Sequence, residues 1–292
     1  MPAHNEAAFI KGALDSITKQ SLQPKKVVVV NDHSSDSTQQ IAEQFATTHS
    51  YFSCVNHSSS QLHMPGSKVV RAFNFGLEQL DNNYDLLLKL DADIILPPNY
   101  LETIAAHFIK NPALGICGGF AYEQDKTGQW LLNHPMDTNH IRGAFKAYSK
   151  VCFEDMGGLR IAMGWDTADE LLAQYHGYKL LTDATLRVKH LRPIGAAYNK
   201  NAKLLQGRAM YGMRYGLIIT LVAALKMALK QKKPSAFFHH IGGYMEAVKE
   251  NASFLVSPEE GVFIRRLRWK KIRNKISMSY QYFVSIYLFR FI

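Results

Sequence analysis

Two aspartates separated by one residue, Asp91 and Asp93, follow the apolar run at 86–90. Successive side chains of an extended segment alternate between its two sides, so both carboxylates face the same way, about 6–7 Å apart. Two hard oxygen ligands on one face, with coordination positions left open, suit Mg²⁺ or Mn²⁺ that also holds a diphosphate. The spacing therefore predicts a metal site, and the alternative is a solvated turn with two capping aspartates.

A third aspartate, Asp32, follows the valine run at 27–30 and precedes His33 and two serines. A carboxylate at this place can accept a hydrogen bond from a nucleobase. The helix that starts near Ser37 offers free backbone N–H groups to an anion. The pattern predicts a nucleotide contact, and helix capping by Asp36 is the simpler alternative.

Short apolar runs alternate with helical patterns through the first part of the chain. This alternation is typical of an α/β fold with a mostly parallel sheet flanked by helices, and ligands bind at the carboxyl ends of the strands in such sheets. Asp32, Asp91 and Asp93 fall at strand ends of this kind. The sequence predicts strands at 27–30, 52–56, 84–90, 114–122 and 185–190, and helices at 6–19, 36–49, 68–80 and 97–110.

The start of the chain is short for this architecture. Such a sheet needs a strand ahead of the helix at 6–19, and only residues 1–4 precede that helix. Loss of a central strand would leave two unpaired edges inside the sheet. We expect that the chain begins inside its first strand or that this sequence lacks some N-terminal residues.

The composition is that of a folded chain of 292 residues and 33.0 kDa. Hydrophobic residues make up 47% and charged residues 20%, which excludes disorder as a description of the whole chain. The three cysteines are odd in number and lack the spacing of metal ligands. A disulfide scaffold and a zinc ribbon are therefore excluded, and a reducing compartment is expected.

Charge divides the chain into an acidic body and a basic tail. Residues 1–186 carry 14 basic and 20 acidic side chains, a net charge of −6, whereas residues 187–292 carry 20 and 4, a net charge of +16. The pattern is helical from about residue 195. We expect a catalytic α/β domain at 1–192 and a basic α-helical extension at 193–292.

The basic extension is expected to meet an anionic surface. Its longest uncharged runs, 215–225 and 276–289, are shorter than the roughly 18–20 residues that span a bilayer, and the N-terminus lacks a signal peptide. Segment 265–275 carries seven basic residues, and each adds about 1 kcal/mol near an anionic leaflet. We expect a cytoplasmic protein, peripheral on the inner face of the cytoplasmic membrane. The alternatives are a solvated helix that packs on the body and nucleic-acid binding, which no motif supports.

Six short motifs occur in order over residues 1–190. Together they resemble the family-2 glycosyltransferases of the GT-A fold, in a bacterial, non-processive type, which transfer a sugar from a nucleoside-diphosphate donor with inversion. The motifs are Pro2-Ala3-His4-Asn5-Glu6, VVVVNDHSSDST, Gly66-Ser67-Lys68 with Asn74-Phe75-Gly76, LLLKLDAD, Met156-Gly157-Gly158-Leu159, and Asp166 with His176-Gly177-Tyr178.

The resemblance implies a role for each matched residue in the donor site. Asp32 matches the aspartate that binds the base, and Lys68 matches a basic residue near the base and phosphates. Asp91 and Asp93 match the motif that binds the metal and the diphosphate. The segment that lines the nucleotide is matched by Pro2, Ala3 and Glu6.

The catalytic base is less well determined, because Trp165 stands where the family has the Glu of a Glu-Asp pair. Asp166 matches the Asp of that pair, which supplies the base, and we favour it; helix capping is its alternative role. Residues 166, 169 and 170 share one helical face, so the residues alone leave Asp166, Asp169 and Glu170 open.

His190 and Arg192 follow at the end of the last predicted strand. In several GT-A enzymes a late histidine completes the metal or pyrophosphate site, which makes His190 a candidate ligand with a structural role as the alternative. Arg192 is a candidate for contact with the pyrophosphate.

The reaction implied by the resemblance depends on Mg²⁺ or Mn²⁺, which would neutralise the charge that grows on the leaving diphosphate. Asp166 would accept the proton of an acceptor hydroxyl. We expect a UDP-sugar as donor and a glycan or lipid-linked acceptor of cell-envelope polysaccharide or glycolipid synthesis. The acceptor pocket is expected from 134–165 and the start of the C-terminal extension, with His134, Asp137, His140, Arg142 and Trp165.

Other classes fit the sequence less well. A P-loop NTPase and a serine hydrolase are not supported, because neither G-x-x-x-x-G-K-[ST] nor G-x-S-x-G occurs. Segment 265–269 lacks the Gln of the Q-x-x-R-W motif that processive synthases carry. A nucleotidyltransferase would show a glycine-rich loop where this chain has PAHNEAA. A catalytically degenerate sugar-nucleotide-binding or scaffold protein at the membrane is the remaining alternative.

Overall fold

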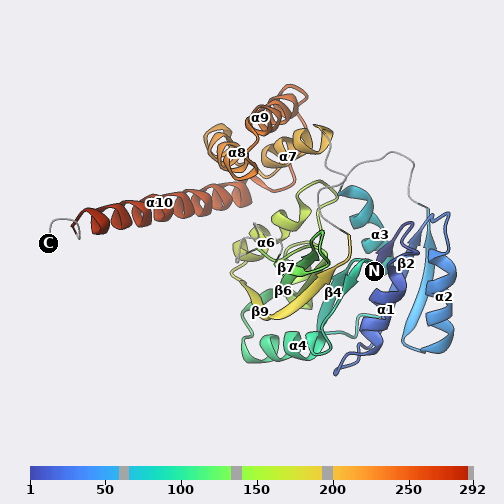
Figure 1. The fold of residues 1–292 in the computed structure, drawn as a ribbon. Helices are drawn as coiled ribbons and strands as arrows, with labels where there is room; N and C mark the ends of the chain where they lie inside the picture. The colour runs from blue at the N-terminus through green and yellow to red at the C-terminus, as the bar shows by residue number, and fades with distance from the viewer. Residues whose placement is uncertain (59–65, 133–139, 193–199, 289–292) are drawn as a thin grey trace. The chain divides into compact units, whose positions relative to one another are not determined.

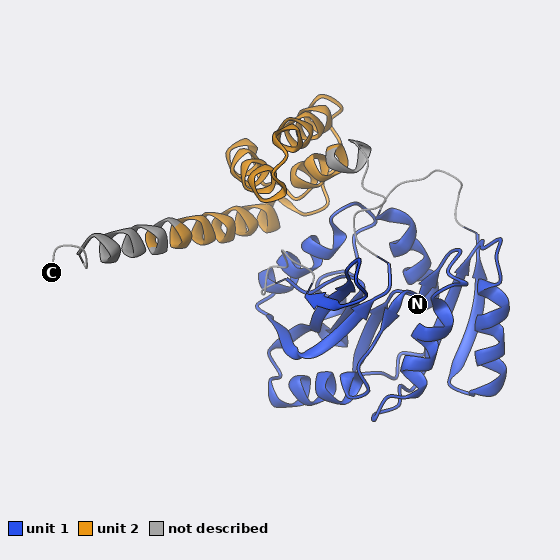
Figure 2. Ribbon diagram, in the orientation of Figure 1, with its two compact units in different colours: residues 1–197 blue, residues 198–292 orange. Residues whose placement is uncertain are grey.

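The computed structural model describes residues 1–58, 66–132, 140–192 and 200–288. The chain divides into two compact units, residues 1–197 and residues 198–292 (Figure 2). The first unit is α/β and the second is helical (Figure 1). The α/β class and the helical C-terminal region are as the sequence predicts.

A three-stranded parallel sheet forms from β1 (Pro2–Ala3), β2 (Val27–Asp32) and β3 (Phe52–His57), in that order. Val28, Val29 and Val30 of β2 are buried and Val27 is half-buried, as expected for a strand with both faces covered. Helix α2 (Thr38–Thr48) packs on β3, and α1 (Ile10–Thr18) packs on α2.

A second, six-stranded sheet has the order β4-β8-β6-β9-β5, with β7 beside β6. Only the β6–β9 pair in it is parallel, so the prediction of a mostly parallel sheet is wrong for this half. Strands β7 and β8 follow β6 without a helix among the described residues, and a chain that lacks a crossover reverses direction. The strands are β4 (Leu86–Leu90), β5 (Ile94–Ile95), β6 (Leu114–Gln124), β7 (Trp130–Leu132), β8 (Phe145–Ser149) and β9 (Lys179–His190).

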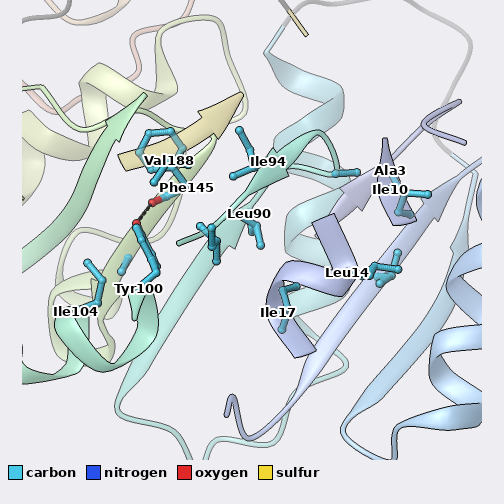
Figure 3. Close-up of a cluster of buried hydrophobic side chains, with 14 of the residues drawn as sticks. Ala3, Ile10, Leu14, Ile17, Leu90, Ile94, Tyr100, Ile104, Phe145 and Val188 are labelled. Carbon is cyan, nitrogen blue, oxygen red and sulfur yellow. Dashed lines mark hydrogen bonds between the residues drawn. The ribbon is translucent and has the colours of Figure 1, made fainter. Parts of the chain in front are cut away.

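A large hydrophobic core connects α1, α2 and α4 (Tyr100–Lys110) with strands of both sheets, and a smaller cluster of Val28, Val30 and Ala72 lies between β2 and α3 (Ser67–Leu77). Figure 3 shows its side chains from α1, from β4 and from the helix that contains Tyr100 and Ile104. The Tyr100 hydroxyl is buried and donates a 2.6 Å hydrogen bond to the carbonyl of Phe145. The remaining helices of this unit are α5 (Lys150–Asp155) and α6 (Trp165–Tyr175).

The helical second unit contains α7 (Lys200–Gly212), α8 (Leu217–Gln231), α9 (Pro234–Lys249) and α10 (Pro258–Leu288). Helices α7 and α9 approach backbone to backbone. A Cβ atom built on Gly207 would lie 1.9 Å from the carbonyl oxygen of His240, and one on Gly243 would lie 1.9 Å from that of Leu204. Within the described ranges, none of the helices has both the length and the apolar character that crossing a bilayer demands.

Candidate active site

The loops that follow β1 and β2 are tied together by side-chain hydrogen bonds. The backbone N–H of Glu6 donates to Thr38 Oγ1 at 2.7 Å, and that of Ala7 donates to Asp36 Oδ2 at 3.1 Å. These bonds hold residues 6–7 in a loop, which explains why α1 begins at Ile10 rather than at the predicted residue 6. Asn5, which has a positive φ of 54°, adds a hydrogen bond in the opposite direction: its Oδ1 accepts from the Ser35 N–H.

Asp32 closes β2 and is 6% exposed. Its carbonyl oxygen lies 2.6 Å from Nδ1 of His4, so the ends of β1 and β2 are fastened at this point. Beside it, the Asn31 amide donates to Asn56 Oδ1 on β3 at 2.8 Å. Pro2 and Ala3 pair with β2 one to two residues before Asp32, which brings these three predicted nucleotide contacts to one edge.

Asp91 and Asp93 lie between the ends of β4 and β5. His190, at the end of β9, places Nε2 3.3 Å from Asp93 Oδ2 and Nδ1 3.5 Å from a Glu123 oxygen. Burial raises the pKa of Asp91 despite an ion pair with Lys89. For Asp93, His190 and Arg192 outweigh the effect of burial and lower the pKa. Asp93 is therefore the more acidic of the two carboxylates.

Arg192 connects the two ends of the first unit. Its Nη2 donates a 2.5 Å hydrogen bond to Oε2 of Glu6, 186 residues away in the sequence. Burial raises the pKa of Glu6 although Arg192 opposes the shift. Two residues predicted separately, one for the nucleotide and one for the pyrophosphate, thus form a single ion pair.

Two buried lysines stand side by side on neighbouring strands. Lys89 on β4 pairs in register with Lys146 on β8, and the two are 1% and 0% exposed. Both ammonium groups lie over the ring of Trp165, at 5.1 Å and 6.0 Å from its centroid. Trp165, at the start of α6, therefore connects the strand that leads to Asp91 with the helix that carries Asp166.

Lys146 neutralises the buried carboxylates of α6. Its Nζ lies 2.9 Å and 3.0 Å from the two oxygens of Asp169 and 3.3 Å from Oε1 of Glu170. The Tyr148 hydroxyl donates a further 2.6 Å bond to Asp169. Burial raises the pKa of Asp169. Burial lowers the pKa of Lys146, but the surrounding carboxylates outweigh burial and raise the pKa of this lysine overall.

Asp166 differs from both neighbours on its helix. Its side chain is 37% exposed and lies 3.7 Å from Nε2 of His140. His140 places its other nitrogen 3.0 Å from Oε1 of Glu170. Burial lowers the pKa of His140, but Glu170 and Asp166 outweigh burial and raise it above 6.5. Lys146 bonds the backbone carbonyl of Asp166 at 2.7 Å, whereas its contacts with Asp169 and Glu170 are to the carboxylates. Of the three acidic candidates, Asp166 has the most exposed carboxylate.

Lys68 lies in the first turn of α3 and is half-buried. Within the part of the chain that the structure describes, no hydrogen bond or ion pair joins it to the other predicted residues. His134 and Asp137 lie outside the described residues. Among the residues that the structure describes, no group of three or more His, Cys, Asp or Glu side chains converges as a metal site.

The site residues predicted from the sequence do not include Lys89, Lys146 or Tyr148. The signal for Lys89 was present, because a lysine inside the run LLLKL must be neutralised if that strand is buried. Lys146 and Tyr148 occupy the short segment FKAYS, whose polar residues hid a central strand. Their partners on α6 are about twenty residues further along the chain.

The model of the family "Glycosyl transferase family 2" matches residues 1–160. The chain belongs to this family. The matched segment contains β1 through β8 with Asp32, Asp91 and Asp93, and it ends before α6 and Asp166.

Two curated relatives of this family-2 glycosyltransferase are bacterial. The poly-beta-1,6-N-acetyl-D-glucosamine synthase of Staphylococcus epidermidis is 27% identical over 119 residues, which are 41% of this chain and 27% of that protein. Glycosyltransferase GlyA of Streptococcus pneumoniae is 26% identical over 133 residues, which are 46% of this chain and 18% of that protein. The matches thus span less than a third of each relative's length.

Solved structures share the GT-A fold with this glycosyltransferase. The mannosyltransferase PcManGT from Pyrobaculum calidifontis, in complex with GDP-Man and Mn²⁺, has a TM-score of 0.53 at 16% identity and covers 91% of this chain and 82% of its own. TarS 1–349 of S. aureus, in complex with UDP-GlcNAc, has a TM-score of 0.52 at 18% identity and covers 70% and 63%. The fold predicted from the sequence is confirmed.

Proposed function

We propose that this family-2 glycosyltransferase transfers one sugar from a nucleoside-diphosphate donor, with UDP as the favoured nucleotide, to a hydroxyl group with inversion. The observation that carries the proposal is the pairing of Asp93 with His190 at the strand ends, in a domain that also presents an exposed Asp166. The acceptor is a glycan or lipid-linked molecule of cell-envelope polysaccharide or glycolipid synthesis. The S. epidermidis relative, named as a polysaccharide synthase, supports this class of acceptor.

The donor chemistry fits a divalent cation. Mg²⁺ and Mn²⁺ bind through one or two carboxylates while substrate phosphates and water supply the other ligands. Asp93 and His190 would hold the metal, with Asp91 beside them. The Mn²⁺ in the PcManGT complex supports this assignment. The bound metal would supply positive charge to the leaving diphosphate.

The nucleotide would lie along the edge formed by Pro2, Ala3 and Asp32. The Asp32 carboxylate is suited to accept from the base, and Glu6 with Arg192 stands at the next loop, where the arginine can turn toward phosphate. Lys68, in the first turn of α3, would add positive charge near the phosphates.

A calorimetric titration tests the donor site. UDP and GDP are titrated with and without Mn²⁺ into the native chain and into Asp93→Ala. We expect metal-dependent binding of UDP that is lost in the variant. Asp85→Ala is the matched control, because Asp85 is an exposed aspartate just ahead of β4. Metal-independent binding of equal strength in both chains would contradict the proposed role of Asp93.

The catalytic base is proposed to be Asp166. Its exposure lets an acceptor hydroxyl reach the carboxylate. The Asp169 carboxylate instead accepts hydrogen bonds from Lys146 and Tyr148. Glu170 is buried and accepts a hydrogen bond from the Ile141 N–H. His140 orients the Asp166 carboxylate from the side. Trp165 faces both buried lysine ammonium groups and belongs to the region proposed for the acceptor.

The base assignment is tested with Asp166→Asn and Asp169→Asn. We expect Asp166→Asn to lower kcat by about 10²–10⁴-fold while the melting temperature is retained. Asp169→Asn should lower the melting temperature instead. An NMR assignment of the product's anomeric configuration completes the test, because retention of the donor's configuration would exclude the single-displacement mechanism. Products longer by more than one sugar would exclude non-processive transfer.

We further propose that the second unit attaches to an anionic membrane surface. Helix α8 exposes large apolar side chains on one face, among them Ile218, Leu225 and Leu229 at 62%, 53% and 70%. Lysines follow at the end of α8, and α10 exposes Arg266, Lys270 and Arg273. An apolar stripe with basic neighbours is typical of helices that lie in a membrane interface.

Vesicle sedimentation tests the attachment. Leu225→Glu with Leu229→Glu should reduce binding to vesicles that contain phosphatidylglycerol, and Ile161→Glu, at an exposed apolar residue of the first unit, should leave it unchanged. Binding of the native chain should also fall with salt and be weak on phosphatidylcholine. Unchanged sedimentation of the double variant would exclude α8 as the contact surface.

A further inference from the structure

His190 stands between two carboxylates of the first unit. Its Nε2 lies 3.3 Å from Oδ2 of Asp93, and its Nδ1 lies 3.5 Å from Oε1 of Glu123. All three side chains are mostly buried: those of His190 and Asp93 are 11% exposed, and that of Glu123 is 18% exposed. The Asp93 side of the ring belongs to the proposed metal site, whereas the function proposed for that site does not use Glu123.

The backbone at the end of β9 holds His190 beside Asp93. His190 pairs in register with Ile94 of β5, and the N–H of Leu191 donates to the carbonyl oxygen of Asp93 at 2.9 Å. Two neighbouring ligand atoms of an octahedral cation with bonds of about 2.1 Å are about 3 Å apart. The 3.3 Å between Nε2 and Oδ2 therefore fits two ligands of one divalent cation.

Strand β6 brings Glu123 to the other side of the ring. It runs parallel to β9 with Tyr122 opposite Lys189, so Glu123 and His190 are the next residues on the two strands (Figure 1). On its other edge, Glu123 pairs in register with Leu131 of β7. Because strands hold the backbone of Glu123 on both edges, its carboxylate approaches Nδ1 from a well-defined position.

Asp93 and Glu123 compete for the single proton of a neutral His190 ring. A proton on Nε2 faces Asp93 and blocks the lone pair that a cation needs. A proton on Nδ1 faces Glu123, and then Nε2 and the Asp93 carboxylate both present lone pairs to the same space. Without Glu123, this second form would leave a mostly buried N–H without its facing acceptor, at a cost in free energy.

The charge of Glu123 acts over the observed distance. At 3.5 Å the carboxylate is somewhat farther from Nδ1 than the usual hydrogen-bond length of about 3 Å. In a mostly buried site, however, solvent and salt screen this charge less than at the surface. A carboxylate behind a histidine ligand orients the ring and makes its free nitrogen a better donor to a metal.

We propose that Glu123 is a positioning residue of the donor site: its carboxylate holds the His190 proton on Nδ1 and leaves the Nε2 lone pair to a divalent cation beside Asp93. The proposal rests on the proposed function, in which Asp93 and His190 hold that cation. Glu123 itself contacts neither the cation nor the sugar nucleotide and acts through the histidine.

Metal affinity tests the proposal in the full chain with Glu123→Met and Glu123→Gln. Methionine removes the charge, and glutamine keeps the size but can either accept from Nδ1 or donate to it, so neither residue selects a tautomer. Glu78→Met, at the exposed C-cap of α3, is the control. Electron paramagnetic resonance of free Mn²⁺ measures its binding in the presence of UDP.

The tautomer is measured separately, without metal, in Asp93→Ala and in Asp93→Ala with Glu123→Met. Removal of the Asp93 carboxylate ends the competition for the proton. Spectra of the ¹⁵N-histidine-labelled chain at about pH 8, where free imidazole is neutral, then report the preference that Glu123 imposes. The signals of His190 are identified by their loss in His190→Gln.

We expect the Kd for Mn²⁺ to rise about tenfold in both Glu123 variants and to stay unchanged in Glu78→Met. The Nδ1–H form should predominate in Asp93→Ala, and its ratio to the Nε2–H form should fall about fivefold when Glu123→Met is added. An equal ratio in these two chains, or native Mn²⁺ affinity in both Glu123 variants, would overturn the role of Glu123. The proposed function fails by a different result, which is native affinity for UDP and Mn²⁺ in Asp93→Ala.

Discussion

Lys89 and Lys146 are neighbours on adjacent strands, equally buried, and stand over the same tryptophan ring, yet their partners differ. Lys146 meets both oxygens of Asp169, one oxygen of Glu170 and the carbonyl of Asp166. Lys89 meets one carboxylate, that of Asp91, whose side chain is 31% exposed. A buried ammonium group enclosed by fixed acceptors stabilises the fold, whereas one that holds a partly exposed carboxylate can serve a ligand.

The largest expected effect comes from the enclosed lysine. Lys146→Met leaves Asp169 and Glu170 buried without their cation, which should cost about 3–5 kcal/mol of unfolding free energy. Urea denaturation measures the loss. Lys126→Met, at an exposed position in the β6–β7 turn, is the control and should change little. A loss below about 1 kcal/mol in Lys146→Met would show that the acidic pair does not depend on this lysine.

Lys89→Met should cost less stability, about 1–3 kcal/mol, because water can reach Asp91 and replace part of the lost interaction. Its effect on the donor should be larger, since Lys89 holds the Asp91 carboxylate in place and limits the rise in its pKa that burial causes. We expect the Kd for UDP with Mn²⁺ to rise about tenfold, a change of 1.4 kcal/mol. If Lys89→Met unfolds the chain as strongly as Lys146→Met and leaves donor affinity unchanged, the distinction between the two lysines is wrong.

The smallest expected effect is a pH dependence of the unfolding free energy. It arises from His140, which stands between Glu170 of the Lys146 cluster and Asp166. The pKa of His140 is raised in the folded chain, so the folded state binds more protons than the unfolded state at pH values just above 6.5. This contribution to stability is complete below pH 6.5 and is lost as the pH rises through the folded-state pKa. His140→Gln should reduce that slope in urea denaturation between pH 5.5 and 8.5. Asp169, whose pKa burial raises to about 7, titrates in the same window and keeps its own contribution. An unchanged slope would mean that His140 does not bridge Glu170 and Asp166 in solution.

Much of the donor side of the site could be predicted from the sequence. Strands β2 and β4 are runs of valine and leucine that end at aspartates. Such local patterns predict a strand and its carboxyl end without long-range information. The metal and nucleotide residues were found for that reason. The pairing of Glu6 with Arg192 was not found, because it joins the two ends of the unit.

The acceptor side could not be predicted to the same depth. Helical spacing places Asp166, Asp169 and Glu170 on one face, and only the strand packed against that face decides which of them is buried. That strand is β8, whose lysine reads as a surface residue until its carboxylate partners are known. The antiparallel direction of β8 could not be predicted for the same reason, because FKAYS has no periodic pattern that indicates a strand.

The backbone contact between α7 and α9 has a consequence for tracing this C-terminal unit through evolution. Gly207 meets the backbone at His240, and Gly243 meets it at Leu204, so the contact is reciprocal and admits no side chain at either glycine. A pair of glycines thirty-six positions apart is therefore sterically constrained on both helices, and we expect both glycines to be retained in related chains. When the rest of the helical sequence has diverged beyond recognition, that spacing is the mark by which distant copies of the unit can be found.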